Sequence, residues 1–199
     1  MKKITIVTLC LLALGSTVFA YDLSVGFGAV FGIVNDKFEA SREYKTEYDW
    51  TDLDFSRLQY GAFAFFGTRY TEFNFSARLS RNKFVFADTG EEDNDDTLML
   101  TVGAYGKIPI SFGTTFVLFP TIGIDFDAVD RDMYLWFRGG LGLDIFFTER
   151  VFLRAQALYG YGIAPFYLIE KATGKYDGGY ENIKPGHGPL AKLGIGWMF

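Results

Sequence analysis

The feature that most restricts the fold of this sequence is a strict alternation of apolar and polar residues. The clearest stretch runs from Tyr70 to Ser80. Its apolar positions are Phe73, Phe75, Ala77 and Leu79, and its polar positions are Glu72, Asn74, Ser76 and Arg78. An extended strand places these two sets on opposite faces, whereas a helix would mix them around its circumference. The stretch is therefore predicted to be a β-strand with one apolar and one polar face.

The same alternation recurs in about eight segments between Tyr21 and the end of the chain. The other apolar series begin at Leu23, Leu98, Phe116, Leu135, Leu153 and Leu193. The segment from Leu58 to Phe66 is ambiguous, because Phe63 and Phe65 make both of its faces apolar. The segments are long enough to cross a bilayer as tilted strands, which takes roughly 9–11 residues. We expect an all-β, antiparallel, up-and-down β-barrel of eight strands.

The connections between these segments alternate between short and long. Short turns are expected near 67–68, 107–111 and 147–150, and longer polar stretches at 36–54, 81–96, 128–132 and 168–188. Short turns on one side and long loops on the other are typical of transmembrane barrels, whose long loops lie outside the cell. The acidic run from Glu91 to Asp96 is expected at a solvated loop tip. A calcium site there is an alternative, although the run lacks the spacing of an EF-hand loop.

The first twenty residues have the pattern of a secretory signal peptide. Lys2 and Lys3 precede the apolar run Ile4–Leu14, and small residues stand at the −3 and −1 positions before a cleavage site after Ala20. The sequence thus predicts a signal peptide at 1–20 and one barrel domain at 21–199. The only cysteine, Cys10, lies within the signal, so the mature chain should have no disulfide and no cysteine-based site.

The composition indicates that the polar face points inward. The chain is 19% aromatic and has 23 glycines, yet its net charge is only −5. A polar face rich in glycine suits the crowded interior of a narrow barrel better than it suits a soluble exterior, which a secreted lipocalin-like barrel would need. This face carries charges of both signs, which we expect to pair inside the lumen: Glu72, Arg78, Asp125, Arg138, Asp144, Arg154 and Lys192. Aromatic residues near strand ends are expected to form interfacial girdles: Tyr70, Trp136, Tyr159, Tyr161 and Trp197.

The last strand carries a further indication. Leu193, Ile195, Trp197 and the terminal Phe199 alternate with small or polar residues up to the C-terminus. This ending resembles the C-terminal signal of outer-membrane barrels, and the mature chain resembles the small eight-stranded superfamily of OmpA-, OmpX- and OmpW-like proteins. The resemblance implies a cell outer-membrane location in a Gram-negative-type bacterium. It also implies that the barrel-assembly machinery reads the terminal residues.

The sequence offers little support for catalysis. His187 is the only histidine, and its neighbours Pro185, Gly186, Gly188 and Pro189 are typical of a turn. We expect no enzyme activity, cofactor, metal or nucleic-acid partner. Three functions stay open. The first is a monomeric envelope barrel in contact with outer-membrane lipids, whose surface loops support the envelope, mediate adhesion or bind a ligand. The second is a narrow OmpW-like channel for small, apolar molecules, lined by Phe63, Phe65 or Val117, and the third is a secreted lipocalin-like binder.

Overall fold

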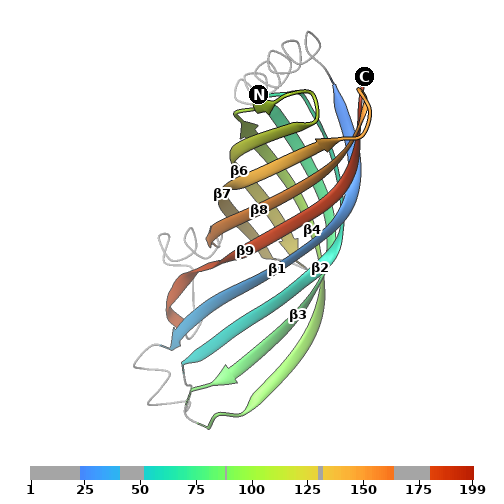
Figure 1. Cartoon of the computed structure of the whole chain (residues 1–199). Coiled ribbons are helices and arrows are strands. Elements are labelled where there is room, and N and C mark those ends of the chain that lie inside the picture. The colour runs from blue at the N-terminus through green and yellow to red at the C-terminus, as the bar shows by residue number, and fades with distance from the viewer. Residues whose placement is uncertain (1–22, 41–51, 88, 130–131, 164–179) are drawn as a thin grey trace, which may run out of the picture.

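The computed structural model describes residues 23–40, 52–87, 89–129, 132–163 and 180–199 as a β-barrel (Figure 1). The strands are β1 (Ser24–Ala40), β2 (Leu53–Gly67), β3 (Thr71–Phe86), β4 (Glu92–Lys107), β5 (Ile110–Phe112), β6 (Phe116–Val129), β7 (Asp132–Phe146), β8 (Val151–Ile163) and β9 (Tyr180–Met198). Among the described residues, no helix has the length and hydropathy that a membrane span requires. The predicted signal peptide and Cys10 lie outside the described residues.

Eight of these strands close into a ring. Neighbours pair antiparallel in the order β4-β3-β2-β1-β9-β8-β7-β6, and β4 pairs with β6 to complete the circle. The strands are shifted relative to one another around the ring. A path that starts at Thr97 of β4 and steps from each residue to its paired partner returns to β4 at Lys107, ten residues further along the chain. A shift of this kind accompanies strands tilted by roughly 35–45°, and side chains fill an eight-stranded interior. The prediction of an eight-stranded antiparallel barrel is confirmed.

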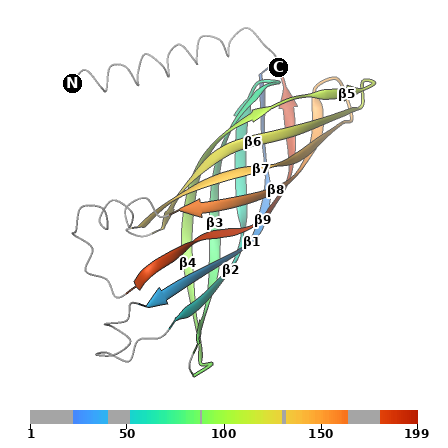
Figure 2. The ribbon, with the colours of Figure 1, turned by 90° about the vertical axis from the view of Figure 1, so that its left-hand side faces the viewer.

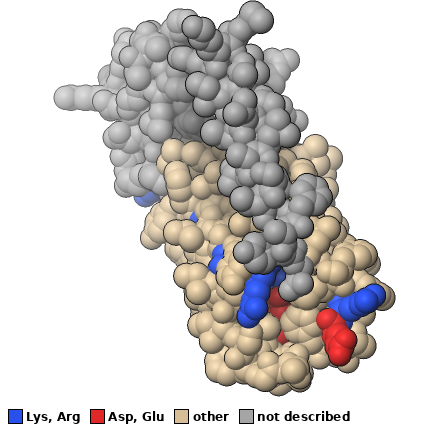
Figure 3. All heavy atoms as spheres, turned by 90° about the horizontal axis from the view of Figure 1, so that it is seen from above, with Lys and Arg blue, Asp and Glu red and all other residues tan. Residues whose placement is uncertain are grey.

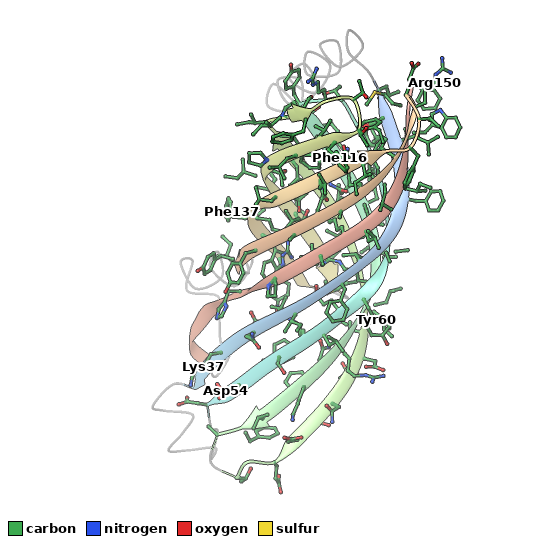
Figure 4. The ribbon with its side chains drawn as sticks, in the orientation of Figure 1. Lys37, Asp54, Tyr60, Phe116, Phe137 and Arg150 are labelled. Atoms are coloured by element: carbon green, nitrogen blue, oxygen red, sulfur yellow. The ribbon has the colours of Figure 1, made fainter. Side chains whose placement is uncertain are left out.

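The exposure of the side chains shows which face of each strand points into the lumen, including the face of β2 that the sequence left ambiguous. On every barrel strand the glycine-rich polar series points into the lumen and the apolar series points outward, as Tyr60, Phe116 and Phe137 do in Figure 4. In β2 the buried rings of Phe63 and Phe65 belong to the lumen. Several of the lumen glycines make room for rings: a Cβ on Gly142 would lie 2.2 Å from the Phe119 ring, and one on Gly196 would lie 2.2 Å from the Phe152 ring.

The outward-facing side chains form an apolar belt with a defined edge. They change from apolar to polar after Ile33 on β1, at the paired Leu58 on β2, after Leu79 on β3 and at its partner Leu98 on β4. On β1 the apolar series spans Leu23 to Ile33, about the 9–11 residues that a tilted transmembrane strand requires. An apolar exterior around a polar, filled interior is the reverse of a soluble barrel. The strands therefore form a transmembrane barrel.

We call the end of the barrel that holds Phe199 the base and the opposite end the mouth. The wall is uneven at the mouth, where β1 to β4 run on well past the ends of β6, β7 and β8 (Figures 1 and 2). Pairing between β4 and β6 stops at Met99 and Val129, whereas β3 and β4 stay paired as far as Val85 and Glu92. The continuation of β1 to β4 beyond the belt edge is called the mouth sheet below.

The mouth sheet corrects the predicted connections. Residues 36–40, 53–54, 81–86 and 92–96 were expected in polar loops, but they continue the strands, and the acidic run from Glu92 onward lies in β4. Likewise, 128–129 and 132 belong to β6 and β7, and 180–188 to β9. At the base, the predicted turn at 107–111 contains most of β5, which pairs with the start of β6 before a turn with positive φ at Gly113. The centres of the predicted connections at 41–51 and 168–179 lie outside the described residues.

Candidate functional site

The predicted lumen charges converge in the barrel from separate strands, and Glu72 and Arg154 occupy the layer nearest the base. Glu72 on β3 accepts hydrogen bonds from Lys107 Nζ at 3.2 Å and from Arg154 Nη1 on β8. Arg154 also makes a two-pronged contact with Asp144, with Nε–Oδ1 at 2.7 Å and Nη2–Oδ2 at 2.6 Å. All four groups are buried. Such paired geometry offsets the cost of removing charges from water.

The next layer joins β6, β7 and β9. Arg138 Nε donates to Asp125 Oδ2 at 2.7 Å, and the Arg138 guanidinium lies 4.5 Å from the centroid of the Trp136 ring. Lys192 packs its ammonium group 4.7 Å from the centroid of the Tyr105 ring. Trp136 is 0% exposed, so its predicted place in an interfacial girdle is wrong. It shares the lumen face with Arg138, two residues along the strand.

The layer nearest the mouth contains a carboxylate that the sequence interpretation missed. Arg78 donates to Asp127 Oδ1 at 2.8 Å and to Gln59 Oε1 at 2.8 Å. Asp127 also accepts a hydrogen bond of 2.7 Å from the hydroxyl of Thr101. The alternation on β6 was the available signal, because Asp127 follows Asp125 by two residues and must share its face.

Aromatic rings fill the space between the charged layers. The Arg154 guanidinium lies 4.4 Å from the centroid of Phe65, 5.2 Å from Phe119 and 5.0 Å from Phe152. Phe63, Phe65, Phe152 and Tyr105 belong to one buried cluster within the barrel. Figure 3 views the molecule from the base, where a few Lys or Arg and Asp or Glu side chains are visible among the described residues. A pocket of about 320 Å³ at this end is lined in part by Lys107, Val117, Asp144 and Arg154.

At the mouth, Arg57 on β2 and Asp36 on β1 form a buried ion pair. The Arg57 guanidinium lies 5.1 Å from the Phe55 ring centroid and 5.0 Å from that of Tyr134. Asp36 stands beyond the apolar belt, between Asn35 and Lys37. Burial raises the pKa of the Asp36 carboxyl, although the charge of Arg57 and its hydrogen bond oppose that shift.

Apart from the buried pair Arg57–Asp36, the mouth sheet carries its ion pairs on exposed positions. Lys37 pairs with Asp54 at 3.3 Å (Figure 4), Arg81 with Asp96 at 3.2 Å, and Lys83 with Glu92 at 2.6 Å. Along Glu92–Leu98, β4 pairs with β3 on one side and with no described strand on the other. Within the described residues, no group of three His, Cys, Asp or Glu side chains is placed to hold a metal ion.

Two other predicted positions differ from expectation. His187 lies within β9 instead of in a turn, faces outward, and places Nδ1 2.9 Å from the hydroxyl of Tyr159. Lys107 was expected near an exposed turn, but its side chain is buried in the lumen. The terminal residues Leu193, Ile195, Trp197 and Phe199 all face outward, and the Phe199 amide donates to the Leu23 carbonyl at 2.8 Å.

Comparison with known proteins extends the description of the fold. No family model matches the chain, and no curated protein matches it in sequence. Among solved structures, the N-terminal β-barrel domain of Pseudomonas aeruginosa OprF is 17% identical with a TM-score of 0.39, over 87% of this chain and 99% of that chain. Neisserial surface protein A is 12% identical with a TM-score of 0.41, over 87% and 97%. The outer-membrane protease OmpT from Escherichia coli is 7% identical with a TM-score of 0.37, over 89% and 96%.

The closed eight-stranded ring follows from the strand pairing of this chain itself.

Proposed function

We propose that this chain is a non-enzymatic, non-conducting barrel of the outer membrane of a Gram-negative-type bacterium, and that it holds the mouth sheet outside the cell as a rigid contact surface. One observation carries the proposal: β3 and β4 remain paired for seven residues of β4 after β6 has ended. Seven residues extend about 24 Å along a strand. Ordered strand built beyond the bilayer favours a role outside the membrane.

The filled lumen supports the absence of conduction. Three charged layers and the rings between them occupy the interior, and Phe63 and Phe65, earlier candidates for lining an apolar path, pack within that cluster. Val117 borders the pocket at the base. In an interior of this packing, a solute would have to displace paired, buried charges, which costs several kcal/mol for each ion.

The open edge of β4 supports protein contact in particular. The unpaired N–H and C=O groups of an edge strand can accept a further strand, as in β-strand addition. Glu92–Leu98 contains no proline or glycine, and its register with β3 is regular. The edge carries Glu92, Asp93, Asp95 and Asp96, which would repel a second copy of itself and attract a basic partner.

The proposal assigns export to the N-terminal segment and membrane insertion to the C-terminal segment. The signal peptide at 1–20 would deliver the chain across the inner membrane, and Leu193, Ile195, Trp197 and Phe199 would be read by the barrel-assembly machinery. Removing Phe199 should lower the amount of the barrel in the outer membrane of cells. The same variant refolded in detergent should keep its heat-modifiable mobility on gels.

Two measurements test the function. Planar bilayers containing the purified barrel should show no conductance steps, and steps above background would refute the non-conducting role. For the surface role, a peptide of alternating lysine and valine should bind the barrel in nonionic detergent. Its form with methylated backbone amides, which cannot pair as a strand, should not bind.

A shortened hairpin supplies the matched variant. Arg81 and Asp96 are paired, so residues 82–95 can be replaced by an Asn-Gly turn that joins them directly. This variant should keep a heat-modifiable barrel and lose peptide binding. Binding that survives the shortening, or that the methylated peptide shares, would show that the open edge is not the contact surface.

A further inference from the structure

The outer wall of the barrel contains an apolar groove that none of the functions above uses. It occupies about 790 Å³ on the faces of β1, β9, β8 and β7. Its outward-facing lining includes four alanines, Ala29, Ala155, Ala157 and Ala191, together with Leu193, and we call it the alanine groove. Strand pairing places Ala191 directly beside Ala157, and in the neighbouring row Leu193 stands between Ala29 and Ala155.

Large side chains border these alanines on both sides. Phe31 and Tyr60 stand on the β1–β2 side, and Leu141 and Leu143 stand on β7. Phe31 pairs directly with Ala191 and Leu141 with Ala157, so each side adjoins the alanines. The groove is thus a depression within the apolar belt, at the depth of the bilayer hydrocarbon.

A polar cluster lies just beyond the mouth end of the groove. Tyr159 continues the outward face of Ala157 by two residues, and its hydroxyl lies 2.9 Å from His187 Nδ1. Tyr161 packs near both, with ring centroids 5.7 Å from Tyr159 and 6.1 Å from His187. Tyrosine rings of this kind sit at the boundary between hydrocarbon and headgroups. An apolar groove therefore leads to a polar cluster at the membrane surface.

We propose that the alanine groove binds one acyl chain of a membrane lipid, with the lipid headgroup against Tyr159 and His187. The occupant follows from shape and position. The groove faces hydrocarbon, its size falls within the roughly 300–1,000 Å³ of ligand sites, and the polar cluster beyond its mouth end matches a lipid with one polar head. A second copy of the chain fits less well, since a two-fold interface would set groove against groove and enclose a void.

Native mass spectrometry of the folded barrel with dipalmitoyl phosphatidylethanolamine in nonionic detergent tests this proposal. The wild-type barrel should retain one lipid. Ala157→Phe with Ala191→Phe should fill the groove and lower the retained fraction by about tenfold. The matched control is Ala64→Phe with Ala77→Phe, which adds the same rings to outward positions on β2 and β3 and should retain lipid as the wild type does.

Each outcome decides between these occupants. Equal retention by the groove variant, or equal loss in the control, would overturn the proposal. A mass of two chains that disappears in the groove variant would assign the groove to a second copy. Tyr159→Phe with His187→Ala should weaken retention without removing it, and unchanged retention would place the headgroup elsewhere. Heat modifiability of each variant on gels verifies folding, and none of these results depends on the mouth sheet.

Discussion

Strands β1 to β4 pass through two environments, and the two halves of each strand use the same alternation differently. Inside the belt, charged side chains face only the lumen, where Glu72 and Arg78 on β3 and Lys107 on β4 are buried and paired. Beyond the belt, charges occupy both faces, and pairs such as Lys83–Glu92 are exposed. The strand geometry is common to both halves, so the difference arises from the surrounding medium. Hydrocarbon tolerates no outward charge, whereas water accepts charge on either face.

The largest expected effect comes from removing a buried charge of the lumen. Arg154→Ala would leave Glu72 and Asp144 buried with fewer cationic partners, and uncompensated buried charges cost about 3–5 kcal/mol. The free energy of unfolding, measured by urea titration of the barrel in lipid vesicles, should fall by that amount. Adding Glu72→Gln should restore part of the loss, because one unpaired carboxylate is then removed. A loss below about 1 kcal/mol, typical of exposed pairs, would show that the lumen is wetter than the packing implies.

A slightly smaller effect is expected when a charge is placed on the outward, apolar face of the belt. Ile122 is 74% exposed in the middle of the outward apolar series of β6. Ile122→Arg would put a charge into hydrocarbon and should destabilise the barrel by about 2–4 kcal/mol in vesicles. Asn94→Arg, on the exposed outer face of β4, provides the control and should change little. Equal effects at the two positions would contradict the assigned edge of the belt.

Substitution of two glycines compares a tightly packed position of the barrel wall with an open one. A Cβ on Gly28 would lie 2.1 Å from the Leu193 carbonyl oxygen and 2.4 Å from the Gly194 Cα, whereas one on Gly106 would meet its nearest atom at 3.9 Å. Since backbone cannot move aside as a side chain can, Gly28→Ala should cost about 1–3 kcal/mol. Gly106→Ala should be nearly neutral in the same unfolding titration. The reverse order would mean that the wall between β1 and β9 is more loosely packed.

The sequence predicted well on which face of a strand each side chain lies, but it did not predict which residues pair across the lumen. Alternation assigns a side chain to a face whatever the register, so the lumen location of Glu72 and Arg78 was accessible. The partner of Arg78 was not, because it depends on how β3 and β6 are shifted around the ring. Trp136 was misplaced because its residue type was weighed above its position two residues before Arg138. His187 shows the same error, since its glycine and proline neighbours suggested a turn although it shares the alternation of β9.

The mouth sheet escaped prediction for a different reason. A run of carboxylates lowers the strand propensity of Glu92–Asp96, and composition alone favours a loop. What supports the strand is its neighbour, because Arg81 and Lys83 on β3 face Asp96 and Glu92 across the hairpin. That compensation becomes visible only when the two strands are aligned.

The smallest expected effect concerns one of these cross-strand pairs. Lys83 and Glu92 are 43% and 53% exposed, so water screens their attraction, and Lys83→Gln should change the free energy of unfolding by about 0–1 kcal/mol. The change should shrink further in 1 M salt, where the Debye length is about 3 Å. The same salt series applied to Arg154→Ala should leave its larger loss nearly intact, because buried pairs are screened much less. If both losses faded equally with salt, the two halves would share one solvent, and the distinction between a sealed lumen and an open sheet would fail.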